Sequence, residues 1–183
     1  MFKLVSRNLQ PNEAQTVVDE VKTTPNITGY SLKEWLSYKK ILVAEDEEGK
    51  MLGVCLYYDF HKNWSFISVL IVLKPFRGMG IGKSLFEKCC DNILRDGKNI
   101  YTASKNPIVI NMMKKMNFTL FDTLFGLPKG YKKYEFIFIL RLINWIFSSY
   151  RLKEAVRKAK LYGVRSNFTY GIKSYEQYQN VRI

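Results

Sequence analysis

A glycine-dense loop holds the residues with the clearest chemical meaning in this chain. It reads RGMGIGK over Arg77–Lys83, and it joins the apolar, β-branched run of residues 66–73 to a helical pattern. Such a junction leaves backbone N–H groups unpaired at the start of a helix, where the helix dipole is positive. Glycines allow close approach of a ligand and backbone dihedrals that other residues avoid. The loop therefore predicts a seat for a phosphate or pyrophosphate.

Spacing separates three kinds of glycine loop. A dinucleotide fingerprint needs G-x-G-x-x-G, whereas Gly78, Gly80 and Gly82 are spaced G-x-G-x-G. A P-loop needs a glycine at position 77, where the chain has Arg77. The pattern Arg/Gln-x-x-Gly-x-Gly/Ala fits Arg77–Gly82 at every position, and it resembles the acyl-CoA pyrophosphate loop of the GNAT superfamily of N-acetyltransferases. The alternative is an ordinary strand-to-helix turn.

A second segment extends this resemblance to roughly residues 1–126. Family members often carry an Asn, then a helix, then an ending similar to Leu-Gly-Phe. Residues 106–118, NPIVINMMKKMNF, have Asn106, a proline where the start of a helix tolerates one, and Phe118 at the end.

The resemblance implies a fold, a cofactor and its contacts. The fold is an α/β (α+β) sandwich with a central mixed β-sheet flanked by helices, and the cofactor is acetyl-CoA. Backbone groups of Leu70, Ile71 and Val72 would pair with the pantetheine arm as an added strand does. Asn106 would contact the cofactor near the second helix. The pyrophosphate would be held by amides of Arg77, Gly78, Met79, Gly80, Ile81, Gly82 and Lys83.

The catalytic half of the family pattern is incomplete. Many members place a Tyr near the CoA sulfur as a general acid, and the matching position here is Met113, which has no proton to donate. The alternatives are unassisted departure of the thiolate, a chain without turnover, or proton donation by another phenol, namely Tyr57, Tyr58 or Tyr101.

The group that removes the proton from the amine is also open. Many members have a Glu on the strand before the glycine loop, where this chain reads Ser68 and Val69. His61 and Asp59 lie in a predicted hairpin near the acceptor side of the resembled fold. A neutral imidazole suits proton removal near pH 7, so both are candidate catalytic residues beside Tyr101, although hairpin residues are usually only solvated.

Periodicity predicts the elements that position these residues. An antiparallel start followed by alternating helices and strands indicates a mixed sheet. Asn12 and Ser31 are expected helix caps, the latter with Glu34 as its capping-box partner. Strands are expected over residues 2–8, 41–44, 51–60, 64–73, 100–103, 118–125 and 166–173, and helices over 13–23, 31–38, 82–95 and 108–115.

Composition fits one domain over residues 1–183 and excludes several classes of protein. Three cysteines cannot all pair, and we expect reduced thiols in a cytoplasmic protein. With His61 as the only histidine, no metal site is expected. The N-terminus has no apolar run long enough for a signal peptide.

The net charge of +13 is concentrated in residues 129–165, which follow the core of residues 1–128. That segment has ten Lys or Arg against two Glu, a net +8, whereas residues 1–128 have a net +4. Its apolar run, residues 136–147, is too short to span a bilayer, which takes about 20 residues. We expect a basic amphipathic helical insertion before a last strand and tail over residues 166–183.

The predicted function is transfer of an acetyl group from acetyl-CoA to a primary amine of a small molecule. The basic insertion favours an anionic acceptor, such as a nucleotide-linked amino sugar. Alternative roles for the insertion are docking of its apolar face on the core or on a second copy in a homodimer, peripheral contact with a membrane, or binding of nucleic acid. Two non-enzyme alternatives are a silent CoA-sensing domain and a basic membrane- or nucleic-acid-binding module.

Overall fold

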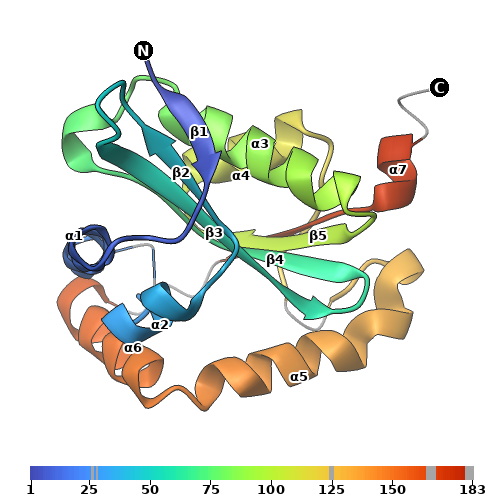
Figure 1. Cartoon of the computed structure of the whole chain (residues 1–183). Coiled ribbons are helices and arrows are strands. Elements are labelled where there is room, and N and C mark those ends of the chain that lie inside the picture. Colours follow the sequence, from blue (N-terminus) through green and yellow to red (C-terminus); the bar gives the residue numbers. More distant parts are fainter. Residues whose placement is uncertain (26, 28, 124–125, 164–167, 180–183) are drawn as a thin grey trace.

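Seven strands form one mixed sheet in the order β1-β2-β3-β4-β5-β7-β6 (Figure 1). The computed structural model describes residues 1–25, 27, 29–123, 126–163 and 168–179. Every neighbouring pair is antiparallel except β4 and β5. The strands are β1 (Lys3–Ser6), β2 (Ile41–Glu45), β3 (Met51–His61), β4 (Trp64–Val72), β5 (Asn99–Ser104), β6 (Thr119–Phe121) and β7 (Thr169–Lys173).

The parallel pair is short and opens into a wedge. β4 pairs with β5 only between Trp64–Ile67 and Asn99–Thr102, so the rest of β4 has no β5 partner. The crossover between them runs through the 3-10 turn η1 (Lys74–Phe76) and helix α3 (Ile81–Arg95), because parallel strands cannot be joined by a tight hairpin. The predicted phosphate loop lies between η1 and α3, at the end of β4.

Helices cover both faces of the sheet (Figure 1). On one face, α3 and α4 (Pro107–Lys115) pack on a core of apolar residues that includes Leu85, Phe86 and Ile100. Tyr side chains of the short α7 (Tyr175–Gln179) pack against the same core. On the other face, α1 (Pro11–Lys22) and α2 (Leu32–Ser37) pack on a core around Trp35.

The basic segment forms two further helices on the α1–α2 face, α5 (Glu135–Ile146) and α6 (Ser149–Tyr162), preceded by the 3-10 turn η2 (Lys129–Tyr134). The apolar inner side of α5 explains its position, because Phe138 packs edge-on against Tyr101 at 4.5 Å between ring centroids. The expected insertion before a last strand is present. That strand, β7, lies between β5 and β6, and it begins at Thr169; residues 166–167 of the expected strand lie outside the described part of the chain.

Most element boundaries differ from expectation by a few residues, and two of these differences have an evident local cause. Helix α1 begins at Pro11 with Gln10 as its cap, since Gln10 and Glu13 form a reciprocal capping box that leaves the expected cap, Asn12, inside the helix. The strand expected over residues 118–125 is β6 alone, because Asn117 adopts a left-handed conformation (φ 57°) and delays its start. Residues 124–125 lie outside the described part of the chain.

Two expectations about the remaining chemistry can be compared with the structure. The three cysteines are unpaired and buried. Within the described residues, no helix is long and apolar enough to cross a membrane.

Candidate active site

The wedge between β4 and β5 opens into a cavity of about 450 Å³. Its floor is formed by β4 from Phe66 to Leu70 and by β5 from Tyr101 to Ser104. The α1–α2 loop, the inner face of α5 and the inner face of α6 provide the walls. Since β4 lacks a β5 partner beyond Ile67, an extended ligand arm can pair with this free strand edge.

The predicted phosphate loop has the conformation that its glycines allow. Gly78 and Gly80 have φ of 85° and 78°, and Gly80 is the N-cap of α3 without a side-chain cap. A Cβ at either position would meet nothing within 4 Å, so the requirement for glycine lies in the backbone conformation rather than in space. The first-turn N–H groups of α3 are therefore left for an anion.

Arg77 fastens this loop. Its Nε donates to the Val72 carbonyl at 3.0 Å, and its guanidinium pairs with Glu20 of α1 at 2.5 Å. Its side chain thus joins the loop to β4 and α1, whereas its backbone N–H donates to the Lys74 carbonyl at 3.5 Å and is not left for the predicted pyrophosphate contact. Lys83 is exposed and pairs with Glu87 at 3.7 Å in the first turns of α3.

The predicted cofactor residues occupy two adjoining regions. Leu70 and Asn106 line the cavity, whereas the loop Arg77–Lys83 lies outside the lining. Asn106 caps α4, because its side-chain Oδ1 accepts a hydrogen bond from the backbone N–H of Ile108 at 2.9 Å. The backbone N–H of Asn106 donates to Ser104 Oγ at 3.0 Å. Ile71 and Val72 also lie outside the lining, and the phosphate loop follows the end of β4 along the chain.

Among the three candidate catalytic residues, only Tyr101 lines the cavity. Its ring is buried, and burial raises the pKa of its phenol well above 10, so the hydroxyl keeps its proton at neutral pH. Of the other phenols considered as proton donors, Tyr57 packs on the α3 side of the sheet and Tyr58 is outside the lining.

Asp59 and His61 do not line the cavity. Asp59 lies near the far end of β3 and accepts hydrogen bonds from Lys40 at 2.9 Å, Ser65 at 2.6 Å and Lys98 at 2.5 Å. Partial burial favours the neutral acid, but these donors outweigh it and lower the pKa of Asp59 to about 2. A carboxylate with this pKa and these partners is a structural anion and a poor base. His61 is exposed in the hairpin, as hairpin residues usually are.

The Tyr30–Ser68 pair was missed by sequence reasoning. The Tyr30 hydroxyl shares a short hydrogen bond with Ser68, and both residues line the cavity. Burial raises the pKa of Tyr30 well above 10, so this phenol too stays protonated at neutral pH. Ser68 stands in the region where the resembled family has its Glu, and that position was the one signal in the sequence. Nothing marked Tyr30, which follows the α1–α2 loop.

Met113 is not a substitute for the family Tyr. Its side chain is fully buried in the core between α3 and the sheet, where its Cε would lie 2.6 Å from a Cβ placed on Gly171. It is also absent from the described lining of the cavity. This position therefore packs α4 against β7.

The charged residues of the cavity are all cationic. Its described lining contains Lys105, Arg141 and Lys158 and no Asp or Glu. The Arg141 guanidinium carbon lies 3.4 Å above the Phe66 ring centroid and 5.3 Å from that of Tyr101, which is cation–π geometry. Its Nε is buried without a hydrogen-bond partner, and no ion pair to Arg141 occurs within the described residues. Arg141 is thus a cation fixed by stacking on Phe66, and it lines the cavity with its buried Nε unpaired.

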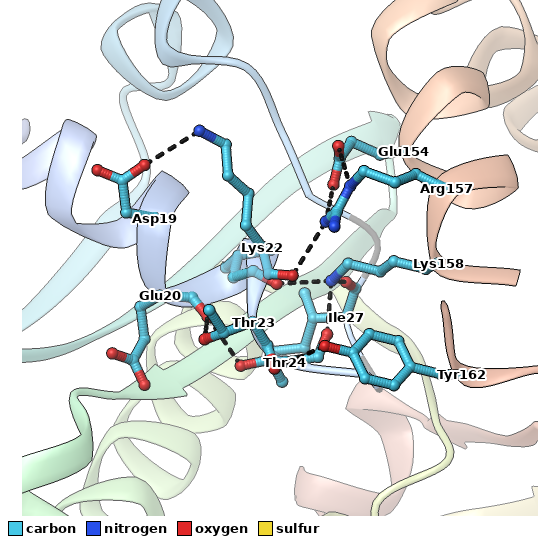
Figure 2. A network of polar contacts seen from close by, with 11 residues as sticks. Asp19, Glu20, Lys22, Thr23, Thr24, Ile27, Glu154, Arg157, Lys158 and Tyr162 are labelled. Carbon is cyan, nitrogen blue, oxygen red and sulfur yellow. Dashed lines mark hydrogen bonds and ion pairs between the residues drawn. The ribbon is translucent and has the colours of Figure 1, made fainter. Parts of the chain in front are cut away.

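Helix α6 is held against the C-terminal end of α1 by basic side chains (Figure 2). Lys158 is buried and donates to the carbonyls of Val21 at 2.6 Å, Thr24 at 2.5 Å and Ile27. Arg157 donates to the Lys22 carbonyl at 2.9 Å. A helix end carries unpaired carbonyls and a negative dipole, so cations stabilise it.

This anchoring shapes the site. Burial lowers the pKa of Lys158 to about 8, while its three carbonyl acceptors require the protonated ammonium for their hydrogen bonds. The same residue lines the cavity, together with Thr24 and Ile27 of the α1–α2 loop. The basic insertion therefore fixes the loop that forms one wall of the wedge.

A split parallel strand pair and a glycine loop at the start of a helix define an α/β fold of the GNAT type. A family model described as the acetyltransferase (GNAT) family matches residues 13–118. The chain therefore belongs to the GNAT acetyltransferase family, and the predicted family and fold class are confirmed. No curated protein has a significantly similar sequence.

Solved structures share the fold at low sequence identity. A mutant of spermidine N-acetyltransferase from Vibrio cholerae is 13% identical, with a TM-score of 0.63, over 100% of this chain and 98% of that chain. A Mycobacterium tuberculosis protein in complex with CoA is 10% identical, with a TM-score of 0.63, over 92% and 97%. N-acetylglutamate synthase from Neisseria gonorrhoeae, complexed with coenzyme A and N-acetyl-glutamate, is 12% identical, with a TM-score of 0.63, over 94% and 35%.

Proposed function

We propose that this protein transfers the acetyl group of acetyl-CoA to the primary amine of a small molecule that also carries an anionic group. Family membership supports the reaction class, and the acceptor class rests on one observation. That observation is the cavity lined by three cations and no described carboxylate, in which Arg141 has unused donors. A purely cationic substrate would meet like charges in that lining.

The chain's own groups fit the roles of a direct transfer. The amine nitrogen attacks the thioester carbonyl, a C–N bond forms and the C–S bond breaks. The amine gives up its proton to water, and the CoA thiolate leaves and takes up a proton. Amides along the free edge of β4 are positioned to polarise the carbonyl and to stabilise the negative charge that develops on its oxygen. Tyr101 is the proton donor that we assign to the departing thiolate, because its phenol is neutral and lines the wedge.

Arg141 holds the anionic group of the acceptor in this proposal. A guanidinium stacked on Phe66 keeps its orientation, and its planar donors suit a carboxylate or a phosphate. Holding the acceptor at one end limits where its amine can lie, which is how orientation contributes to the rate of a two-substrate reaction.

Matched amine pairs test the acceptor class. Acetylation by mass spectrometry would be compared for glucosamine 6-phosphate and glucosamine, for an amino acid and its amide, and for spermidine. The anionic member of at least one pair should be preferred, and Arg141→Met should remove that preference. If spermidine or the neutral members are acetylated equally well, the anionic acceptor is wrong while the reaction class stands. If no amine reacts and acetyl-CoA does not bind, the transferase itself is wrong.

A further inference from the structure

Helix α5 is apolar on two opposite sides, and only one of them is used by the fold. Phe138 is buried against β4 and β5, and Trp145 lines the cavity. On the other side, large apolar side chains stand in solvent at intervals of four, three and four residues, at Phe136, Leu140, Ile143 and Phe147. The exposed fraction reaches 69% for Phe136 and 82% for Phe147. A helix that is apolar all round is normally buried or in contact with a membrane.

The next helix continues this surface. On α6, Leu152 and Val156 are exposed one turn apart, with the exposed Lys153 and Lys160 beside them. The inward side of α6 carries the residues that hold it to α1. We call the outward surface of α5 and α6 the outer face, formed by Phe136, Leu140, Ile143, Phe147, Leu152, Lys153, Val156 and Lys160. Figure 1 shows both helices along the border of the molecule, away from the sheet.

The charges that residues 129–165 bring to the outer face are mainly positive, while Glu34 of α2 lies at the start of α6 and pairs with Arg151 at 2.8 Å. Lys129, Lys132 and Lys133 are exposed in the turn that leads into α5, and they add to the two lysines of α6. The segment has only two acids: Glu154 is buried and bound to Arg157 at 2.8 Å, and Glu135 is partly buried. The outer face therefore combines an exposed apolar stripe with several exposed lysines.

We propose that the outer face binds the surface of an anionic lipid bilayer, with α5 lying in the interfacial plane. Apolar side chains enter the region of the headgroups and acyl chains while lysines meet anionic headgroups, each contributing by charge and by its apolar stem. Helix α5 has 12 residues, which suits a helix lying on a bilayer and not one crossing it. The proposal is independent of the acetyltransferase reaction.

Charge decides between a bilayer and other occupants. Two copies of this chain that met through their outer faces would bring together two segments of net charge +8 each. Like charges across an interface oppose association. Nucleic acid would neutralise the lysines but leave the apolar stripe in water, because phosphates offer it no apolar partner. An anionic bilayer satisfies both components.

Sedimentation with vesicles tests the proposal on the full chain. Vesicles of phosphatidylcholine with about one third phosphatidylglycerol should bind the protein, and pure phosphatidylcholine vesicles should bind it weakly. The double variant Phe136→Ser/Phe147→Ser should lower partitioning about tenfold or more, given the value of burying a Phe side chain. The matched control is Ile108→Ser, which removes an apolar side chain that is 71% exposed on α4, and it should bind as the unchanged protein does.

A second measurement tests the proposal without the double variant, in case that variant does not fold. In Phe147→Trp, the new indole should shift its emission to the blue on anionic vesicles and be quenched by brominated lipid, whereas Ile108→Trp should show neither change. Absence of vesicle binding, or equal quenching of both indoles, would overturn the proposal. It would also be overturned if the double variant dissociated a dimer and left vesicle binding unchanged, which would identify a second copy as the occupant.

Discussion

Replacing Gly80 with Val tests whether the glycine loop is the pyrophosphate seat. Gly80 has φ 78°, a conformation that costs an L-residue about 1–2 kcal/mol, and more when the side chain is β-branched. The strained residue leaves this region and turns the first amides of α3 away from the ligand. A hydrogen bond to a charged group is worth about 1.5–3 kcal/mol, so loss of one lowers the affinity for acetyl-CoA about 10- to 150-fold.

The chain provides a matched control in Gly49. It has φ 82° in the turn between β2 and β3, and a Cβ there would also meet nothing within 4 Å. Gly49→Val and Gly80→Val should therefore lower the free energy of unfolding by similar amounts, about 1–2 kcal/mol, while only Gly80→Val weakens acetyl-CoA binding.

Calorimetric titration with two ligands makes this test specific. Acetyl-CoA should bind weakly to Gly80→Val, and S-acetyl-pantetheine, which lacks the pyrophosphate, should bind the variant and the unchanged protein equally. Equal loss of both ligands would mean that the substitution distorts the wedge itself. Unchanged acetyl-CoA affinity would refute the assignment of the pyrophosphate to this loop.

Three further variants test the roles assigned to polar groups. Tyr101→Phe should lower kcat without changing acetyl-CoA affinity, whereas Asp59→Asn should leave kcat unchanged and lower the free energy of unfolding at pH 7 by about 1–2 kcal/mol, a value reduced for partial exposure. Folding lowers the pKa of Asp59 from 3.8 to about 2, so its contribution to stability is complete above about pH 4 and is lost as the pH falls toward 2. In urea unfolding, the free energies of unfolding of Asp59→Asn and the unchanged protein should therefore converge in acid. A difference that stays constant with pH would contradict this. Lys158→Met leaves three carbonyls without their donor and should cost about 2–4 kcal/mol. Its control Lys153→Met, on the exposed side of the same helix, should stay within about 0.5 kcal/mol in the same assay.

The parts of this fold that could be predicted are those that depend on residues close together in the sequence. The glycine loop combines backbone freedom with a helix start, and the capping box of Ser31 and Glu34 lies within four residues, so both could be recognised without tertiary information. Asn106 at the cap of α4 was recognisable for the same reason. These features depend on spacing along the chain.

The acceptor side of the site could not be predicted in this way, because it depends on contacts between distant segments. Arg141 reaches Phe66 and Tyr101 across some 40 to 75 positions of sequence, and Tyr30 reaches Ser68 across 38 positions. Its place in the predicted hairpin favoured Asp59 as a base, but Lys40 and Lys98, each just before a strand, form ion pairs with it. The sequence shows the type of each of these side chains, but it does not show which distant residue each of them contacts.

The two sides of α5 connect the acceptor cavity with the outer face. One side holds Arg141 above Phe66 and places Trp145 in the cavity wall, while the other exposes Phe136 and Phe147. A helix held by a cation–π contact and by the α6 anchor on α1 cannot rotate to bury its outer stripe without dismantling the acceptor wall. The exposed stripe is therefore fixed by the same contacts that build the cavity. Under the membrane proposal, a bilayer that covers it gains apolar contact without any rearrangement of the site, and it would bring acceptors at an anionic surface close to a cavity lined by Lys105, Arg141 and Lys158.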